Sequence, residues 1–421
     1  MWPSGGLRSR ARTIAECGLL VYLLTIPMGR ALPGWTRELP LLLIVWGMVL
    51  ARLPRGRPSP SVPPFGLLVP FALFMSTTGI SVLFSAFPEA SLSRAAYAPI
   101  AALLFLAIQD VLIQPSAYRR LLVVASVVVL LLGLDGAYQF WTGASLLGGN
   151  LRFGGPGGRI AGSLPNPNDM ALIPILLPLA LTVVVFVPWP WATALTLLGL
   201  PVALATTLLS GSRNAWLGLA VAFGTLGAFR SHHRLALGAA ALAAALFAAA
   251  LALGLGHIAD RMHLIFDAPN DPRVGYWLVA WRMFTESPLF GKGIHTYEEF
   301  YLPYLSRIRL PAGYAPEVAF IPWAHNLYLE ILAERGIVGA VGCGALGLAI
   351  TRGLVRVFVD SMPAEAKCVA AGVASALAAF LVLGIFDLTF LKDWVLLIFV
   401  LLAALVARLP IFSGSVPPPP D

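Results

Sequence analysis

The chain has 421 residues, of which 58% are hydrophobic and only 11% are charged. Because soluble proteins carry roughly 25% charged residues, this composition excludes a soluble enzyme, and it also excludes a disordered or fibrous protein. The 28 Lys and Arg against 20 Asp and Glu give a net charge of +8, which in a membrane protein indicates basic cytoplasmic loops and anionic lipid partners rather than nucleic acid.

Long unbroken apolar stretches predict an all-α membrane protein, since strands of a transmembrane β-barrel would alternate over about 10 residues. A spanning helix needs about 20 apolar residues. By that length we expect about twelve spans, of which the second and eighth are the shortest. They are 14–30, 38–51, 63–85, 94–113, 121–142, 169–187, 190–210, 214–229, 235–256, 324–350, 368–387 and 392–410.

The distribution of basic residues predicts the orientation. With the N-terminus inside, the inner segments hold fourteen Arg and Lys and the short outer segments hold seven. Because positive charge gathers in cytoplasmic loops, both termini are expected inside. The outer segments 143–168 and 257–323 are too long for simple turns and are expected to be functional. The predicted parts are an N-terminal bundle of nine helices, a large outer loop with amphipathic helices, three C-terminal spans and a disordered tail, namely 1–256, 257–323, 324–412 and 413–421.

His325 is the first candidate for chemistry, because it stands where a polar outer loop becomes an apolar helix. Apolar residues follow at i+4 and i+7, which places His325 on a packed helix face. Asn326 beside it could orient the imidazole ring. The alternative is a boundary histidine that only hydrogen-bonds a carbonyl. Glu330 lies further along the same helix and is predicted to be a structural partner of Arg335.

Three of the arginines in the outer part of the predicted protein are considered as candidates. Arg213 lies between two apolar segments, where an unpaired charge is costly. Arg273 opens a predicted amphipathic helix that contains interfacial tryptophans. Arginine binds phosphate with two N–H groups and keeps its proton, so Arg213 and Arg273, with a histidine to accept a hydroxyl proton, indicate group transfer from a lipid diphosphate. The alternative is snorkelling to the membrane boundary, which we favour for Arg282.

Motifs for metal and nucleotide chemistry are missing from the sequence. There is no Asp-x-Asp, His-x-x-His or Cys-x-x-Cys pattern, and Asp267 and Asp271 stand isolated, so no metal site is predicted. There is no phosphate-binding loop for ATP. The three cysteines lie in or beside apolar runs and are interpreted as small core residues.

Four stretches together resemble the O-antigen ligase superfamily, integral-membrane proteins that include O-antigen ligases, O-antigen polymerases and protein O-oligosaccharyltransferases. One stretch resembles the family's His-Asn pair followed by Gly-x-x-Gly, here Gly336 and Gly339. Another resembles its Arg-x-x-x-Leu, here Arg213 and Leu217. The stretches are GRIAGSLPNPNDMA (158–171), GSRNAWLGL (211–219), RVGYWLVAWRMFTESPLFGKGIHTY (273–297) and HNLYLEILAERGIVG (325–339).

The resemblance implies a GT-C-like transferase that moves glycan from undecaprenyl diphosphate to lipid A–core on the periplasmic face of the inner membrane. It implies that Arg213 and Arg273 hold the diphosphate, that His325 activates the acceptor hydroxyl, and that no metal or other cofactor is needed. The implied partners are the lipid-linked O-antigen donor, the lipid A–core acceptor and membrane lipids. Three further residues match a family stretch without an assigned role, although Asn is also a good helix N-cap; they are Arg159, Asn166 and Asn168.

The acceptor stays open at this stage, because a polymerase would use a second lipid-linked glycan and an oligosaccharyltransferase a protein hydroxyl. We favour the ligase because twelve spans with one dominant outer loop fit its layout. A lipid-glycan transporter is the alternative of another class, and it would place charged residues near the bilayer midplane. Asp110, Asp135 and Asp387 are the nearest such residues, yet they fall toward predicted helix ends. If His325 is not the base, Glu330 and Asp387 are the next candidates.

Overall fold

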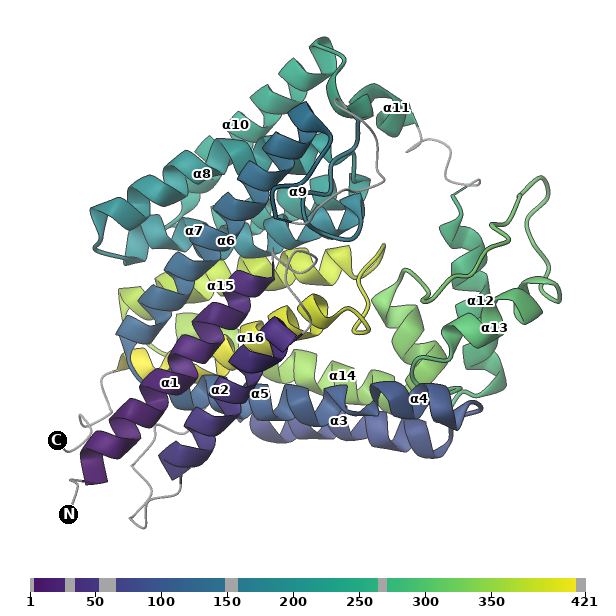
Figure 1. The fold of residues 1–421 in the computed structure, drawn as a ribbon, viewed down its shortest axis with the longest axis horizontal. Coiled ribbons are helices and arrows are strands. Elements are labelled where there is room, and N and C mark those ends of the chain that lie inside the picture. Colours follow the sequence, from purple (N-terminus) through teal and green to yellow (C-terminus); the bar gives the residue numbers. More distant parts are fainter. Residues whose placement is uncertain (1–3, 27–34, 53–65, 148–157, 264–270, 414–421) are drawn as a thin grey trace.

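The computed structural model describes residues 4–26, 35–52, 66–147, 158–263 and 271–413, and within these ranges the chain is all-α, with no β-strand (Figure 1). The elements are α1 (Ser4–Thr25), α2 (Trp35–Arg52), α3 (Leu68–Leu83), α4 (Pro88–Ala95), α5 (Tyr97–Val111), α6 (Pro115–Thr142), η1 (Pro167–Ala171), α7 (Leu172–Phe186), α8 (Pro190–Leu209), α9 (Arg213–Gly227), α10 (His233–Ala252), η2 (Leu255–His257), α11 (Ile258–His263), α12 (Arg273–Glu286), α13 (Tyr297–Leu305), α14 (Leu327–Val359), α15 (Ala364–Leu383), α16 (Asp393–Arg408) and η4 (Leu409–Ser413).

Each of the twelve predicted spans coincides with a helix, which confirms a polytopic all-α membrane protein. Eight helical segments of the described chain are long and apolar enough to cross a bilayer: Pro88–Val111, Pro115–Thr142, Pro167–Phe186, Pro190–Leu209, His233–Ala252, Leu327–Val359, Ala364–Leu383 and Asp393–Ser413. Parts of α2 and α3 are apolar but shorter. Twelve therefore remains the predicted number of spans. Parts of both long outer segments, and the predicted tail from residue 414 on, lie outside the described residues.

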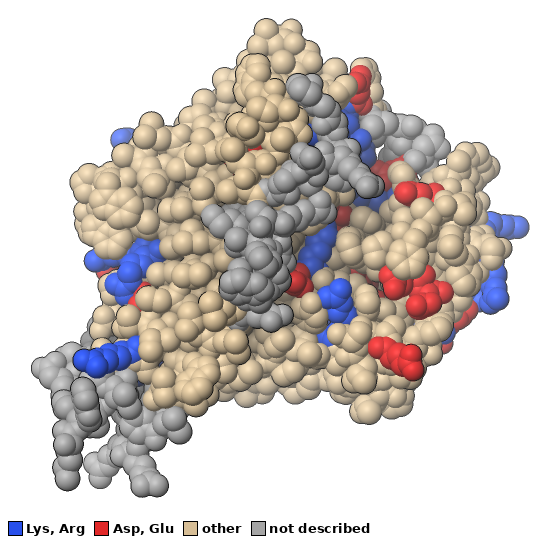
Figure 2. All heavy atoms as spheres, in the orientation of Figure 1, with Lys and Arg blue, Asp and Glu red and all other residues tan. Residues whose placement is uncertain are grey.

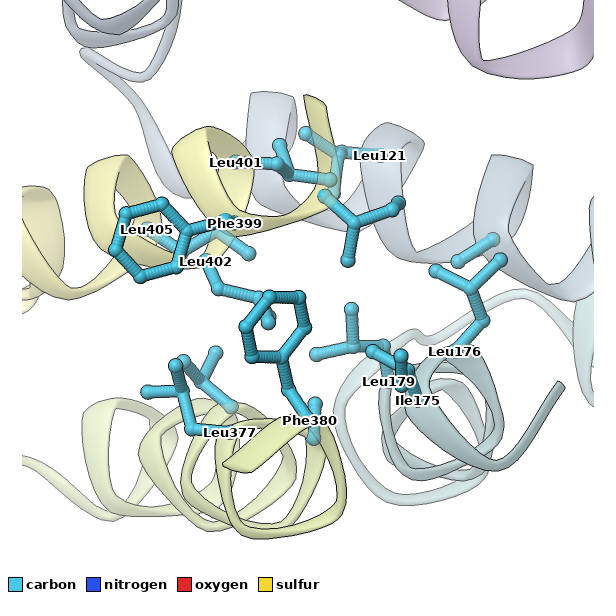
Figure 3. Packing of buried hydrophobic residues seen from close by; sticks show 14 of the residues in the cluster. Leu121, Ile175, Leu176, Leu179, Leu377, Phe380, Phe399, Leu401, Leu402 and Leu405 are labelled. Atoms are coloured by element: carbon cyan, nitrogen blue, oxygen red, sulfur yellow. The ribbon is translucent and has the colours of Figure 1, made fainter. Parts of the chain in front are cut away.

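The core lies where α6, α7, α15 and α16 meet, and its apolar side chains interdigitate there (Figure 3). Phe380 of α15 and Phe399 of α16 stack with ring centroids 5.7 Å apart. In a bilayer, close packing rather than water exclusion holds helices together, and small residues allow it. At Gly372 a Cβ would lie 2.1 Å from the hydroxyl oxygen of Thr182, so only glycine lets α15 approach α7 this closely.

The two ends of the bundle differ in chemistry. Arg120 of α6 donates two hydrogen bonds to Glu16 of α1, and Arg408 of α16 donates to the carbonyl of Gln109 in α5. These contacts join α6 to α1 and α16 to α5 at the end of the bundle that lies far from α12 and α13 (Figure 1). In Figure 2, charged side chains are sparse over the bundle and gather toward its two ends, one of them around α12 and α13. The segment with the candidate site therefore caps one end.

A break in α14 attaches the outer segment to the bundle. Gly336 has φ +62°, and the backbone N–H groups of Ile337 and Val338 bond to the carbonyls of Pro288 and Leu289 instead of to their own helix. In return, the N–H of Lys292 bonds to a carbonyl of α14, that of Ala333. A Cβ at position 336 would lie 2.3 Å from the Leu289 oxygen, so glycine is required by conformation and by space.

We expect Gly336→Ala to destabilise the protein by about 1–3 kcal/mol or more, because alanine is strained at this positive φ and its methyl group meets the Leu289 carbonyl. The thermal unfolding midpoint of the purified protein in detergent should fall by several degrees. Gly344→Ala, in the same helix, is the matched control, since a Cβ there meets no atom within 4 Å. Equal midpoints for the two variants would contradict this account of the break.

Candidate active site

His325 lies just before α14 rather than on its face. Its φ is +50°, and α14 begins at Leu327 with Asn326 as its N-cap. The Asn326 side chain accepts hydrogen bonds from the N–H groups of Tyr328 and Leu329, so its contacts are with the backbone of the helix. The prediction that His325 lies on a face of this helix is wrong, because the helix begins two residues later.

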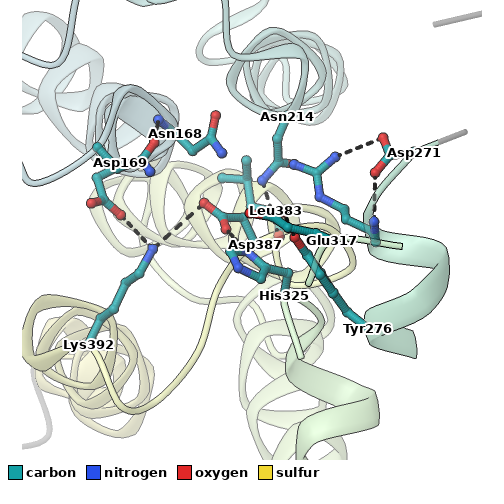
Figure 4. A network of polar contacts seen from close by, with 12 residues as sticks. Asn168, Asp169, Asn214, Asp271, Tyr276, Glu317, His325, Leu383, Asp387 and Lys392 are labelled. Carbon is teal, nitrogen blue, oxygen red and sulfur yellow. Dashed lines mark hydrogen bonds and ion pairs between the residues drawn. The ribbon is translucent and has the colours of Figure 1, made fainter. Parts of the chain in front are cut away.

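His325 belongs to a chain of buried charged groups that Figure 4 draws in full. The ring atom Nδ1 lies 2.6 Å from Oδ1 of Asp387. The other carboxylate oxygen of Asp387 lies 3.7 Å from Nζ of Lys392, which donates a 2.7 Å hydrogen bond to Asp169. Asp387 and Asp169 each expose only 2% of their surface. These linked side chains join the loop before α14, the loop before α16 and the short helix η1.

The charges of these linked side chains determine which ring nitrogen of His325 donates to Asp387. Burial alone would raise the pKa of Asp387, but the Lys392 ammonium and the hydrogen bond from His325 outweigh it and lower that pKa. Burial also opposes the charge on Lys392, yet Asp169 and Asp387 raise its pKa, so it stays cationic. An ionised carboxylate only accepts hydrogen bonds. Nδ1 of His325 therefore donates to Asp387, and Nε2 is the ring nitrogen that is available to accept a substrate proton.

Aromatic side chains enclose the imidazole. The ring centroid of Tyr276 in α12 lies 5.2 Å from that of His325, and that of Trp323 lies 5.7 Å away. The Tyr276 hydroxyl donates a short hydrogen bond to Glu317, and burial followed by this contact raises the pKa of Tyr276. Because Tyr276 comes one turn after Arg273 in α12, the helix that holds His325 in place also carries the candidate phosphate ligand.

Arg213 and Arg273 share one carboxylate, that of Asp271. Arg213 stands at the beginning of α9, whose N-cap is Ser212, and its Nη2 lies 2.9 Å from Oδ2 of Asp271. Nη1 of Arg273 lies 3.4 Å from the same oxygen, and the backbone N–H of Arg273 bonds to Oδ1. One anionic group thus brings together two arginines that lie 60 residues apart in the sequence.

Arg159 and Arg261 add two more cations to this cluster. The Nε of Arg159 donates to the carbonyl of Ser210, and the Nε of Arg261 donates to the carbonyl of Gly211, so both lie against the turn that leads into α9. Burial, followed by the charges of Arg261, Arg213 and Arg273, lowers the pKa of Arg159 to about 10. Arg159 still carries its charge at neutral pH. Among the described residues, these four arginines lie near one carboxylate that contacts two of them, an arrangement that favours a polyvalent anion.

Backbone contacts fix the arginine cluster relative to His325. Asn214, next to Arg213, donates its side-chain N–H to the carbonyl of Leu383 at the end of α15, as Figure 4 shows. Asp387 follows four residues later, and its N–H bonds to the same carbonyl. The N–H of Leu327 bonds to the carbonyl of Gly384. The end of α15 therefore contacts both the beginning of α9 and the beginning of α14.

The remaining predicted residues differ in whether they contact the arginine cluster or His325. Asn168 accepts from Nη2 of Arg159 and so contacts the cluster, whereas Asn166 caps η1 by accepting from the N–H of Asn168. Glu330 is buried and accepts from the hydroxyl of Thr389, without an ion pair to Arg335 in the described chain. Arg282 pairs with Glu286 on the surface of α12 and is not part of either group.

Sequence reasoning missed three members of the site. In the sequence Asp271 stands as an isolated acid, although it lies two residues before Arg273. Lys392 and Arg261 are not among the candidates that the sequence indicates. Their roles depend on long-range pairing, as between Lys392 and Asp169, which are 223 residues apart. Among the described residues, no three His, Cys, Asp or Glu side chains gather as a metal site would require.

Residues 192–343 match the family model described as O-antigen ligase. This range contains Arg213, Arg273 and His325, while Asp387 and Lys392 lie beyond it. The match supports the resemblance to the O-antigen ligase superfamily and contains three of the four sequence stretches, while the stretch 158–171 lies before it. No curated protein matches the chain.

Proposed function

We propose that the chain transfers O-antigen glycan from undecaprenyl diphosphate to a sugar hydroxyl of lipid A–core on the periplasmic face of the inner membrane, because residues 192–343 match the family model described as O-antigen ligase. The family implies a glycosyltransferase-like enzyme of O-antigen or polysaccharide assembly. The observation that supports the finer proposal is one arrangement: a histidine polarised by a buried aspartate, next to four arginines.

The proposed reaction follows from the placement of these groups. The acceptor hydroxyl attacks the anomeric carbon of the donor sugar, the bond from that carbon to the diphosphate oxygen breaks, and the hydroxyl proton passes to Nε2 of His325. Asp387 stabilises the imidazolium that forms. Arg213 and Arg273 balance the negative charge that develops on the leaving diphosphate. The products are the glycosylated acceptor and undecaprenyl diphosphate, and His325 then releases its proton to water.

Asp271 also has a role in this scheme, because it contacts both Arg213 and Arg273. It keeps Arg213 and Arg273 2.9 Å and 3.4 Å from one oxygen, so their guanidinium groups already point toward a common centre. A diphosphate carries more charge and more acceptor oxygens than one carboxylate, so we propose that it takes over these contacts when the donor binds. The arginines then need little reorganisation, which is the condition for effective electrostatic catalysis.

The test of the proposed function is reconstitution. The purified protein in liposomes is given undecaprenyl-diphosphate-linked O-antigen and, in separate reactions, lipid A–core, a second donor molecule or an acceptor protein. We expect glycosylated lipid A–core with release of undecaprenyl diphosphate. Product from the second donor alone would make the protein a polymerase, and product from the protein alone an oligosaccharyltransferase.

We expect transfer to persist in excess EDTA, because arginines supply the positive charge that a metal ion supplies in other transferases. The measurement is the initial rate of glycan transfer before and after chelation. A rate lost on chelation and restored by magnesium or manganese would contradict the arginine-based account.

We expect the α12–α13 segment to face the periplasm. Ser306 is exposed just after α13, and Ser361 is exposed between α14 and α15, so a cysteine at each position tests opposite ends of α14. In a background without Cys17, Cys343 and Cys368, a membrane-impermeant thiol reagent should label Ser306→Cys in intact spheroplasts and label Ser361→Cys only after lysis. The reverse pattern would invert the orientation.

A further inference from the structure

The two segments that carry His325 and Asp387 are joined by a second side-chain hydrogen bond. The first is the 2.6 Å contact between Nδ1 of His325 and Oδ1 of Asp387. In the second, the hydroxyl of Thr389 donates to Oε1 of Glu330 over 2.5 Å. Glu330 lies five residues after His325, and Thr389 lies two residues after Asp387. The start of α14 and the loop before α16 are therefore linked at the proposed base and again one turn further along the helix.

Thr389 shapes the turn between Asp387 and Lys392. Its hydroxyl oxygen accepts a hydrogen bond from the backbone N–H of Leu391, and its carbonyl accepts one from the N–H of Lys392. Because the oxygen accepts from Leu391, the single hydroxyl proton is free to go to Glu330. Thr389 is fully buried, so water does not compete for these contacts. A displacement of Thr389 would therefore move the turn that holds both Asp387 and Lys392.

The Glu330 carboxylate is buried and has few partners. The hydroxyl of Thr389 is its one hydrogen-bond donor among the described residues, because the other carboxylate oxygen, Oε2, is buried without a partner there. A buried carboxylate that receives so few hydrogen bonds costs stability. Proteins keep such costs mainly at functional sites. Packing alone therefore does not account for an acid at this position.

Glu330 does not reach the space in which a substrate can meet His325. A cavity of about 750 Å³ lies beside His325, and Asp387 and Lys392 are among its lining residues. Neither Glu330 nor Thr389 is among the described residues that line it. Glu330 lines a second cavity of about 30 Å³, which is far below the size of a ligand pocket. Any effect of Glu330 on the reaction must therefore pass through Thr389 and its loop.

We propose that Glu330 is a positioning residue for the transfer reaction, and that it acts through Thr389 to hold Asp387 against Nδ1 of His325. The inference rests on the proposed function, in which Nε2 of His325 accepts the proton of the acceptor hydroxyl. The partner of a catalytic histidine fixes the tautomer and the orientation of the ring. Without the contact between Glu330 and Thr389, the loop with Asp387 is less constrained, and His325 populates the tautomer with its proton on Nε2, which cannot act as the base.

The first test is transfer kinetics with undecaprenyl-diphosphate-linked O-antigen and lipid A–core. Thr389→Val removes the hydroxyl and should lower kcat about 10- to 100-fold, the order expected for a misplaced catalytic group, with both KM values within about twofold of wild type. Glu330→Ala should show the same loss. Glu330→Gln should recover most of it, because the amide oxygen of glutamine can accept the same hydrogen bond from Thr389.

Ser375→Ala is the matched control for the loss of a buried hydroxyl. Ser375 is fully buried in α15 and donates to the carbonyl of Ala371 in the same helix, so it has no contact with the loop that carries Asp387. This variant should have wild-type kcat and KM values.

The tautomer of His325 provides a second readout that needs no transfer activity. In ¹⁵N NMR spectra of the purified protein labelled at histidine, the signals of His325 are those absent from His325→Ala. They should show the proton on Nδ1 in wild type, Glu330→Gln and Ser375→Ala, and a mixture of both tautomers in Thr389→Val and Glu330→Ala.

Wild-type kcat in Thr389→Val, or an unchanged His325 tautomer in that variant, would overturn the positioning role while leaving the proposed function intact. The role would also be overturned by a Glu330→Gln variant as impaired as Glu330→Ala, because the carboxylate would then act through its charge or as a base. Absence of transfer by the wild-type protein would instead overturn the proposed function, and the tautomer spectra would still decide whether Glu330 and Thr389 hold Asp387 against His325.

Discussion

His325→Ala is expected to lower the rate of glycan transfer by about 10²–10⁴-fold, the usual contribution of a positioned general base. A sugar hydroxyl is a poor nucleophile at neutral pH, and Nε2 of His325 is the atom that the hydrogen bond from Nδ1 to Asp387 leaves free to accept its proton. The measurement is single-turnover transfer with saturating donor and acceptor.

Binding of the donor should survive this change, because the diphosphate is assigned to the arginines. Since His325 precedes the α14 N-cap and is held mainly by contacts of its ring, its removal leaves the helix cap at Asn326 intact. Should His325→Ala instead lose donor binding while its remaining turnovers run at the wild-type rate, the histidine would be part of the diphosphate site. The base would then be sought at Asp387 or Glu330.

Arg213→Lys is expected to lower transfer about 10- to 100-fold, less than the 10²–10³-fold typical of removing a transition-state donor outright. Lysine keeps the charge but not the planar pair of N–H groups that binds two phosphate oxygens. Arg273→Lys should behave similarly, because both arginines contact the same oxygen of Asp271. The donor KM and kcat of each variant are the quantities to measure.

Arg282→Lys is the matched comparison for these two variants. Arg282 lies on the same helix as Arg273 but pairs on the surface with Glu286, and an exposed pair of this kind contributes little. Wild-type kinetics for both Arg213→Lys and Arg273→Lys would identify these residues as membrane-boundary anchors, and the donor site would have to lie elsewhere.

The helical architecture could be predicted from the sequence because a bilayer leaves an apolar segment few alternatives. Every backbone polar group inside it must be satisfied within the helix, so the length of an apolar run largely determines where a span lies. Arg213 could be identified for the same reason, since a charge between two apolar segments is costly without a partner. The partner itself, Asp271, could not be identified by that argument.

The finer geometry of the site depends on contacts that local patterns do not contain. Helical periodicity placed His325 on a face of α14, but a residue with φ +50° precedes the helix. Gly336 belongs to a motif in the sequence, but the motif does not show why glycine is required there. The structure does, because the carbonyl of Leu289, from another segment, leaves no room for a Cβ. The Lys392–Asp169 pair likewise forms only when two distant loops meet.

The proposed roles are diphosphate binding by Arg213 and Arg273 and proton acceptance by His325. The most direct test of them is a structure of the protein with undecaprenyl diphosphate bound. The account predicts the diphosphate between Arg213 and Arg273, with Asp271 displaced from at least one of them. A diphosphate bound away from both arginines, with the Asp271 contacts unchanged, would contradict it.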